Sequence, residues 1–184
     1  MEIVLARHGR PGLDQGSWIT PHEVAEWVRA YNESGVVLGD PPRDVCAKAG
    51  GCGAILSSPL TRCVESARAL APSRDIVTQE ALREAGLPYP SWGFPRLPPS
   101  VWIVLFRLAW FLGYSGNSES VAMAKSRARG AATRLIEIAG EHQSVFVMGH
   151  GIMTALIVKQ LIEMGWVGPK RPAHGYWQFS VYRN

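Results

Sequence analysis

The chain has 184 residues, of which 47% are hydrophobic and 18% are charged, as is typical of one folded domain with a sizeable core. The formal net charge of +4 is a small excess without a basic tail, so we expect a small anionic substrate and no nucleic acid. The first residues lack the charged and apolar regions of a signal peptide, so we expect a cytoplasmic protein. The three cysteines lack Cys-x-x-Cys spacing, and we expect them to be free thiols in this reducing compartment.

The first predicted element is a short apolar strand over residues 3–6, buried on both faces. The strand ends at Arg7, His8 and Gly9. Ligands of open α/β sheets bind where the strands end at their carboxyl side. A glycine there lets the backbone turn sharply and approach a ligand closely. These three residues are therefore candidates for a binding site.

The next segments are less regular. Residues 10–17 form a loop rich in glycine and proline. Thr20 is predicted to cap a helix that begins at Pro21, with Glu23 as the reciprocal acid of a capping box, and the helix is expected to reach about residue 34. For residues 36–53 only a short strand near 36–38 is predicted.

A second apolar strand, over residues 54–57, runs through two serines and a proline into a helix over residues 60–71. Arg62 falls in the first turn of this helix, where a cation opposes the helix dipole. An anion bound at this terminus would explain the arginine. The alternative is a side chain that extends into solvent. Cys63 is expected to be a small buried residue rather than an activated thiol.

The region 86–117 is the least typical part of the chain. Five prolines interrupt its first half, and residues 101–112 form an apolar helix of about 20 Å. A bilayer core is roughly 30 Å thick, and Arg107 lies within the helix, so no transmembrane segment is expected. We interpret this helix as a cap over the site, a homodimer interface or a membrane-surface contact, with an additional core helix as the alternative.

A third apolar strand, over residues 144–148, ends at Gly149, His150 and Gly151. A basic side chain between two glycines thus follows this strand, as basic side chains follow the other two. The remaining predicted elements are helices over residues 120–139 and 152–164 and strands over 76–77 and 176–181.

The three strand ends together resemble the signature of the histidine phosphatase superfamily, the phosphoglycerate mutase-like family. The matching motifs are Arg-His-Gly, Ser-Ser-Pro-x-x-Arg and Gly-His-Gly, in this order. The resemblance spans residues 3–161 apart from 86–117. It implies a single domain over residues 1–184, folded as a three-layer α/β sandwich with a mostly parallel sheet and helices on both faces. Residues 86–117 would be a hydrophobic, proline-rich cap inserted into this domain.

The sequence departs from the family in two places. Arg10 and Asp14 stand where relatives carry an acidic or amide residue and an asparagine, so Asp14 is assigned no role. The Trp-Glu-Gly that follows the acid-bearing segment of relatives is missing, and the chain continues Leu87-Pro88-Tyr89.

Two guanidinium groups and two imidazoles around one point suit a tetrahedral oxyanion. The resemblance implies that His8 is the nucleophile, that His150 binds the phosphate and that a glutamate protonates the leaving group. This general acid is expected to be Glu84, with Glu80 as its rival. No metal ion or cofactor is expected, since arginines supply the charge. The predicted catalytic residues are Arg7, His8, Arg62, Glu84 and His150, and the predicted substrate-binding residues are Arg7, Gly9, Arg62, His150 and Gly151.

The function expected from this resemblance is that of a histidine acid phosphatase-type phosphomonoester hydrolase, acting through a phosphohistidine intermediate. A phosphomutase of the same family and a non-catalytic phosphate-binding protein are the alternatives. Small metabolites and phosphoproteins both remain candidate substrates.

Overall fold

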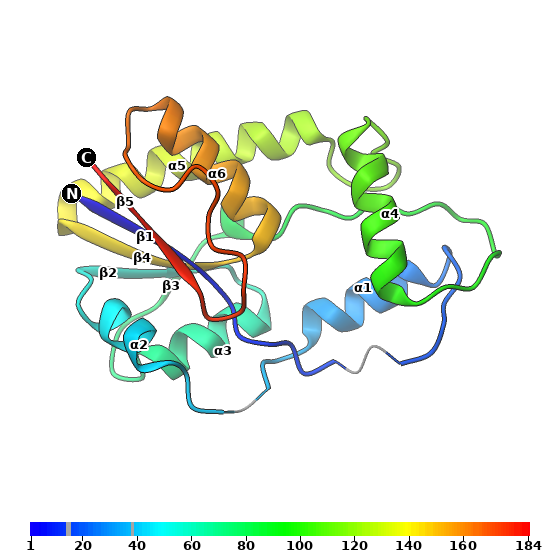
Figure 1. Cartoon of the computed structure of the whole chain (residues 1–184), viewed down its shortest axis with the longest axis horizontal. Coiled ribbons are helices and arrows are strands. Elements are labelled where there is room, and N and C mark those ends of the chain that lie inside the picture. The colour runs from blue at the N-terminus through cyan, green and yellow to red at the C-terminus, as the bar shows by residue number, and fades with distance from the viewer. Residues whose placement is uncertain (14–15, 38) are drawn as a thin grey trace.

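The computed structural model describes residues 1–13, 16–37 and 39–184, and within them five strands form one sheet (Figure 1). The strand order is β3-β2-β4-β1-β5, and every neighbouring pair is parallel except β1 with β5. The predicted mostly parallel sheet is confirmed. The strands are β1 (Glu2–Arg7), β2 (Ala54–Ser57), β3 (Val77–Thr78), β4 (Ser144–Gly149) and β5 (Phe179–Arg183).

Helices cover both faces of the sheet. On one face lie α5 (Val121–His142) and α6 (Gly151–Glu163), and on the other lie α2 (Arg43–Gly50) and α3 (Thr61–Leu70). Side chains of a strand point alternately to its two faces. Accordingly, Ile3 and Leu5 of β1 pack with α5 and α6, whereas Val4 and Ala6 pack with α2 and α3. The three-layer α/β sandwich is confirmed.

The carboxyl ends of β1, β2 and β4 lie at one edge of the sheet. β4 stands between the other two strands, and its register pairs Gly149 with Arg7 and Met148 with Ser57. Residues that follow these strands are therefore neighbours in space, although they are far apart in the sequence. In Figure 1 this edge faces α1 (Val24–Glu33) and α4 (Pro99–Phe111), which stand apart from the sheet.

The capping box before α1 is present. Glu23 Oε2 accepts a hydrogen bond from the Thr20 N–H at 2.7 Å, and Thr20 Oγ1 accepts one from the Glu23 N–H at 3.4 Å. These reciprocal bonds satisfy two donors that a helix start leaves free. Residues 21–23 form a turn, so the regular helix begins at Val24 rather than at Pro21.

The segment 36–53 differs from the sequence-based expectation. It contains the helix α2, which buries only Val45 and Ala49. So short an amphipathic pattern is hard to distinguish from a loop when prolines and glycines flank it. The strand expected near 36–38 is reduced to one bridge between Val36 and Pro11, and Leu38 and Asp14 lie outside the described residues.

The two edge strands lie later in the sequence than expected. β3 covers Val77–Thr78 instead of residues 76–77, and β5 covers Phe179–Arg183 instead of residues 176–181. Tyr176 and Trp177 form a turn before β5, in which Trp177 has a left-handed φ of 61°. This turn returns the chain to the carboxyl end of β1, where the Trp177 N–H donates to the Arg7 carbonyl at 3.1 Å.

Helix α4 is buried along one side only. Trp102 and Phe106 pack against Val24 in a small separate core beside α1. Among the described residues, no helix combines the length and apolar character needed to cross a membrane. The opposite face of α4 and its end expose the apolar side chains of Val101, Val104, Leu105, Leu108, Phe111 and Leu112.

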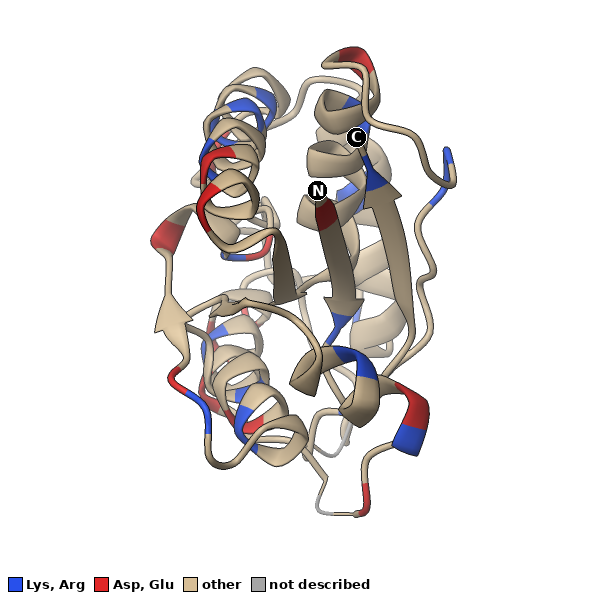
Figure 2. Cartoon of the chain, turned by 90° about the vertical axis from the view of Figure 1, so that its left-hand side faces the viewer, with Lys and Arg blue, Asp and Glu red and all other residues tan. Residues whose placement is uncertain are grey.

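The chain ends meet at the side of the sheet opposite to α1 and α4 (Figure 1). The Met1 amino group donates to the Asn184 carbonyl at 2.9 Å, and Glu2 pairs with Lys48 at 2.6 Å and with Arg183 at 3.0 Å. Figure 2 shows basic and acidic residues interspersed over the helices and strand ends rather than gathered in one stripe. These contacts join β1, α2 and β5 at the end of the fold opposite to the carboxyl ends of β1, β2 and β4.

Candidate active site

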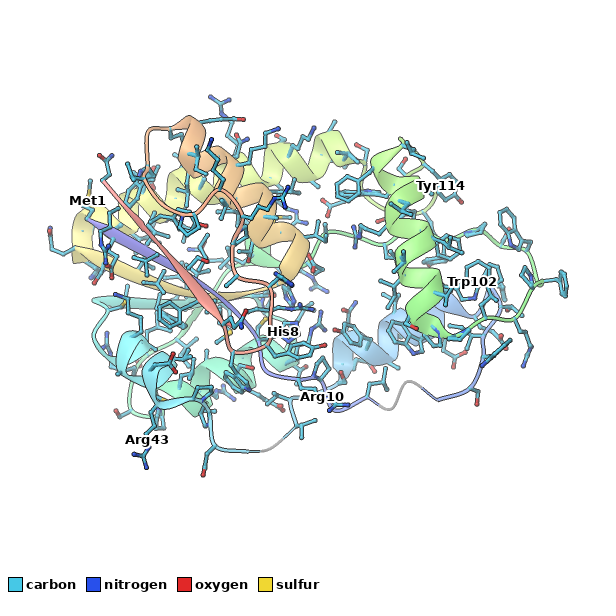
Figure 3. All side chains as sticks on the ribbon, viewed as in Figure 1. Met1, His8, Arg10, Arg43, Trp102 and Tyr114 are labelled. Atoms are coloured by element: carbon cyan, nitrogen blue, oxygen red, sulfur yellow. The ribbon has the colours of Figure 1, made fainter. Side chains whose placement is uncertain are left out.

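Three strand ends bring His8, Arg62 and His150 together. His8, which is labelled in Figure 3, follows β1. Arg62 lies in the first turn of α3 after β2, and His150 follows β4. Their side chains are buried, with exposed fractions of 2%, 1% and 1%. The ring centres of His8 and His150 are 5.1 Å apart, and Arg62 Nη2 lies 3.3 Å from His150 Nδ1. The structure thus places these three predicted residues in one cluster.

Arg7 adds a second guanidinium to the cluster from the end of β1. Its Nη1 donates to the His174 carbonyl, and its guanidinium carbon lies 4.7 Å from the ring centre of Tyr176. A Cβ atom on Gly151 would lie 4.0 Å from this carbon, so Arg7 also neighbours the start of α6. The Nε atoms of Arg7 and Arg62 are buried and have no hydrogen-bond partner among the described residues. An oxyanion between these arginines would satisfy donors that are unfavourable to bury alone.

His8 is a neutral imidazole with one free ring nitrogen. Its Nδ1 lies 2.7 Å from the Gly9 carbonyl oxygen, which only accepts hydrogen bonds, so Nδ1 carries the hydrogen and Nε2 keeps its lone pair. The pKa of His8 is lowered from 6.5 to about 3, chiefly by burial and also by the charges of Arg62 and Arg7, whereas the bond to Gly9 opposes them. The Nε2 lone pair is therefore available at neutral pH, as a nucleophile requires.

His150 is oriented by two partners. Arg62 Nη2 donates to its Nδ1 at 3.3 Å, so the hydrogen is assigned to Nε2, which donates to Ser58 Oγ at 2.8 Å. Burial, followed by the charge of Arg62, holds the pKa of His150 well below 6.5. Both histidines of the cluster are therefore neutral in the free protein at neutral pH.

The end of α1 holds Arg62 in place. Arg62 Nη1 donates to the Tyr31 carbonyl at 2.9 Å and to Asn32 Oδ1 at 3.3 Å, and its guanidinium carbon lies 4.4 Å from the Tyr31 ring centre. Carbonyl groups at a helix C-terminus carry partial negative charge, which stabilises the buried cation. Burial lowers the pKa of Arg62, but an arginine keeps its charge at neutral pH. This arrangement leaves Arg62 Nη2 beside the histidines.

Gly9 occupies a position with no space for a side chain. A Cβ atom there would lie 2.4 Å from side-chain atoms of both Trp177 and Val36. The Gly9 N–H donates to Ser66 Oγ at 2.9 Å, which fixes the peptide between His8 and Gly9, and the Gly9 carbonyl of the next peptide orients the His8 ring. The glycine thus acts on the site through backbone position, and a substrate contact is not needed to explain it.

Glu84 lies closer to the cluster than its rival Glu80 does. The Glu84 carboxylate accepts hydrogen bonds from the N–H groups of Met153 at 2.9 Å and Ile152 at 3.3 Å, in the first turn of the helix that follows His150. The Glu80 side chain is 76% exposed and pairs with Arg83 at 3.4 Å. Both carboxylates line one cavity, and Glu84 is the one fixed against the start of α6.

The turn that carries Glu84 is held by charged residues of α4 and α5 and the segment between them. Arg127 Nη1 donates to the carbonyl groups of residues 81 and 83, each at 2.8 Å, and Arg127 pairs with Glu119 at 2.5 Å. Glu119 Oε1 also accepts from the Gly86 N–H at 3.0 Å. Arg107 donates to the carbonyl groups of residues 85 and 86 at 2.9 and 3.0 Å. These contacts fix the backbone on both sides of the glutamate.

Cys63 is buried against the cluster. Its Sγ atom lies 3.3 Å from His150 Nε2 and 3.5 Å from the Gly149 carbonyl. Burial raises the pKa of the Cys63 thiol, so it stays protonated, and the expectation of a buried residue is confirmed. Within the described ranges, no group of three or more His, Cys, Asp or Glu side chains is arranged to hold a metal ion.

Several residues around the site are absent from the set predicted from sequence. They lie at a helix end, on α4 and α5 and in the turn before β5, and none belongs to a recognisable motif. The one signal in the sequence is the aromatic pair at i and i+4 in α1, formed by Trp27 and Tyr31, which indicates a shared helix face. The residues missed are Tyr31, Asn32, Arg107, Arg127, His174 and Tyr176.

The geometry defines a class of protein. Two arginines and two neutral histidines meet at the carboxyl edge of a parallel sheet, and a glutamate lies beside the same cavity. This is an α/β protein with a site suited to a phosphoryl group.

The family follows from comparison with known sequences. The family model of the histidine phosphatase superfamily (branch 1) matches residues 46–183, and the chain belongs to this superfamily. The match begins after β1, so the pairing of β1 with β4 is what places Arg7 and His8 beside the matched region. No curated protein matches the chain with statistical significance.

Solved structures of the same fold share little sequence with the chain. A mycobacterial glucosyl-3-phosphoglycerate phosphatase in complex with VO3 is 19% identical, with a TM-score of 0.64, and the match covers 99% of this chain and 96% of that one. A protein of Escherichia coli K-12 proposed to be an α-ribazole-5′-P phosphatase is 18% identical, with a TM-score of 0.64 and coverages of 98% and 89%. A phosphoserine phosphatase of Entamoeba histolytica in complex with phosphoserine is 16% identical, with a TM-score of 0.57 and coverages of 88% and 80%. These likenesses confirm the fold.

Proposed function

We propose that the protein is a phosphomonoester hydrolase of histidine acid phosphatase type in which His8 becomes transiently phosphorylated. The observation that carries this proposal is the hydrogen bond from His8 Nδ1 to the Gly9 carbonyl, because it leaves Nε2 free within a buried cationic cluster. Arg7 and Arg62 supply the positive charge that a phosphoryl group in transfer requires.

The first step is in-line attack of His8 Nε2 on the phosphorus atom. An N–P bond forms and the bond from phosphorus to the ester oxygen breaks, while Glu84, which this step requires in its protonated form, gives its proton to the departing oxygen. The product alcohol leaves and phosphohistidine remains. A phosphate dianion beside His150 favours the protonated imidazole, because an opposite charge nearby stabilises the charged form.

The second step returns the enzyme to its starting state. The Glu84 carboxylate takes a proton from a water molecule as the water oxygen attacks phosphorus and the N–P bond breaks. Inorganic phosphate leaves, His8 regains its lone pair, and Glu84 holds the proton that it gave up in the first step. No metal ion or cofactor takes part in this scheme.

Release of phosphate from p-nitrophenyl phosphate tests the proposal. We expect steady turnover, unaffected by a chelator and abolished in His8→Ala but retained in His22→Ala, which removes an exposed histidine before α1. A phosphomutase or a non-catalytic phosphate-binding protein would give no steady release, and an acid-labile label on His8 would distinguish these two. Wild-type turnover by His8→Ala would contradict the proposal.

We further propose that residues 86–117 form a cap on this single domain. Leu87, Ile103 and Arg107 of this segment line the cavity above the cluster, which supports the interpretation.

The exposed apolar face of α4 supports the proposal of a homodimer formed through this helix. The three cysteines are free thiols, in line with the cytoplasmic location we propose.

A further inference from the structure

The cavity above the basic cluster is much larger than a phosphoryl group needs. Its volume is about 1050 Å³, which is at the upper end of the range of roughly 300–1,000 Å³ for sites of drug-sized ligands. Arg7 and Arg62 of the cluster line it on one side, and Ile103 lines it from α4. In Figure 3, His8 and the helix that carries Trp102 stand on opposite sides of this space. A substrate that fills the cavity therefore has a sizeable body attached to its phosphate.

One wall of the cavity is apolar and partly aromatic. Trp27 and Val28 of α1 face it together with Leu60, Leu87 and Ile103. The Trp27 ring is stacked on the Tyr31 ring, with centres 5.1 Å apart and an interplanar angle of 13°, so this part of the wall is rigid and flat. Trp27 Nε1 is buried without a hydrogen-bond partner among the described residues.

The charged groups of the other wall already have partners. Both Nη atoms of Arg107 bond to backbone carbonyl groups, and Arg127 bonds to two further carbonyls and to Glu119. Fewer of their donors are therefore free for a second anionic group or for a row of hydroxyls on a substrate. Polar groups placed against the apolar wall would lose hydrogen bonds to water without replacement. The cavity thus favours an apolar body over a polyhydroxylated one.

We propose that the substrate is a phosphate monoester of a largely apolar alcohol, alkyl or aromatic, whose body lies between Trp27 of α1 and Ile103 of α4. This inference rests on the proposed hydrolysis at His8 and adds the substrate class. Segment 86–117 then has a defined task, since it contributes Leu87 and Ile103 to the surface that recognises the alcohol.

A series of primary alkyl phosphates tests the proposal, because the leaving groups of ethyl, butyl and hexyl phosphate are chemically alike. Each methylene removed from water strengthens an interaction by about fourfold. We expect kcat/KM to rise along the series, with hexyl phosphate at least about tenfold above both ethyl phosphate and glucose 6-phosphate. Equal values for hexyl and ethyl phosphate, or a higher value for glucose 6-phosphate, would overturn the substrate class and leave hydrolysis standing.

Two substitutions on neighbouring positions of α4 provide a matched pair. Ile103→Ser alters the cavity wall, and Val104→Ser alters the exposed face, where the valine is 58% exposed. Ile103→Ser is expected to lower the ratio of kcat/KM for hexyl over ethyl phosphate by about tenfold, and Val104→Ser is expected to preserve the ratio. A ratio unchanged by Ile103→Ser would contradict the placement of the body.

Binding of phosphonates separates this inference from the proposed function. Hexylphosphonate and ethylphosphonate carry no cleavable ester, so calorimetry reports recognition even when turnover is absent. We expect hexylphosphonate to bind at least about tenfold more tightly than ethylphosphonate. Tighter binding without hydrolysis of any ester would overturn the hydrolase and keep the ligand class, whereas equal binding would overturn the ligand class.

Discussion

Arg107 on α4 donates from Nη1 to the Gly86 carbonyl at 3.0 Å, so the helix of the proposed cap is hydrogen-bonded to the segment that carries Glu84. Its Nη2 donates to the preceding carbonyl at 2.9 Å, and its guanidinium carbon lies 4.9 Å from the Trp110 ring centre. The segment that departs most from the family pattern is therefore bonded to the two residues that follow the proposed general acid. Arg107 acts here as a positioning residue.

Arg107→Met keeps an apolar stem and removes both donors to the turn. We expect kcat on alkyl phosphates to fall by about 10- to 100-fold, because a displaced acid no longer meets the leaving oxygen. p-Nitrophenyl phosphate, whose leaving group needs little protonation, is expected to lose much less. Arg129→Met, at an exposed position on α5, is the control. Equal losses on both substrates would show that Arg107 supports the fold alone.

Glu84→Gln tests the general acid itself. General acid–base catalysis contributes about 10²- to 10⁴-fold, and we expect a loss of this size in kcat on ethyl phosphate, with a smaller loss on p-nitrophenyl phosphate. Glu80→Gln removes the rival carboxylate, which is exposed and pairs with Arg83. This variant is expected to stay within about twofold of wild type. The reverse pattern would assign the acid to Glu80.

The buried state of His8 predicts how stability depends on pH. Its pKa is lowered to about 3 in the folded chain, whereas an unfolded chain has a value of about 6.5. Between these values the unfolded chain binds more protons, so the free energy of unfolding falls as the pH falls, by up to about 1.4 kcal/mol per pH unit for this histidine. Above about pH 6.5, the contribution of His8 to the free energy of unfolding no longer changes with pH.

Urea denaturation at pH 7.5, 6.0 and 5.0 measures this slope. The lowered pKa of His150 acts in the same direction, so His8→Gln is expected to reduce the slope without removing it. NMR of the wild-type His8 ring should show no titration above pH 5. A slope that His8→Gln leaves unchanged would contradict the buried neutral imidazole.

Gly9→Ala tests the backbone position beside His8. The added Cβ atom would meet Trp177 and Val36 at 2.4 Å, so the peptide that orients His8 must shift. Overpacking of this kind destabilises by about 1–3 kcal/mol, and we expect kcat to fall by at least about tenfold with it. Gly12→Ala, whose Cβ atom would lie 3.7 Å from its nearest neighbour, is the matched control. Wild-type activity in Gly9→Ala would show that His8 does not depend on this peptide.

The sheet and the basic cluster were predictable because they depend on continuous apolar strands and on short motifs after them. β1, β2 and β4 are buried on both faces, so their central residues are apolar, and their parallel order places Arg7, His8, Arg62 and His150 at one edge. The residues that hold the backbone on both sides of Glu84 were not predictable. Arg107 and Arg127 reach backbone carbonyl groups, and any residue type supplies a carbonyl, so no pattern in the sequence marks such contacts.

The outer face of α4 yields the last prediction. Val104, Leu105 and Leu108 are exposed at helical spacing, as in an interface between two helices. If this face joins two copies of the chain, Leu108→Glu places two carboxylates in an apolar contact and is expected to raise the dimer dissociation constant by at least about 100-fold. Sedimentation velocity over a concentration series measures the change. Met123→Glu, on an exposed residue of α5, adds the same charge outside this face and should leave the constant within about twofold. A wild-type chain that sediments as a monomer at every concentration would rule out this dimer. A contact that removes from water the six exposed apolar side chains of α4 and its end should persist on dilution.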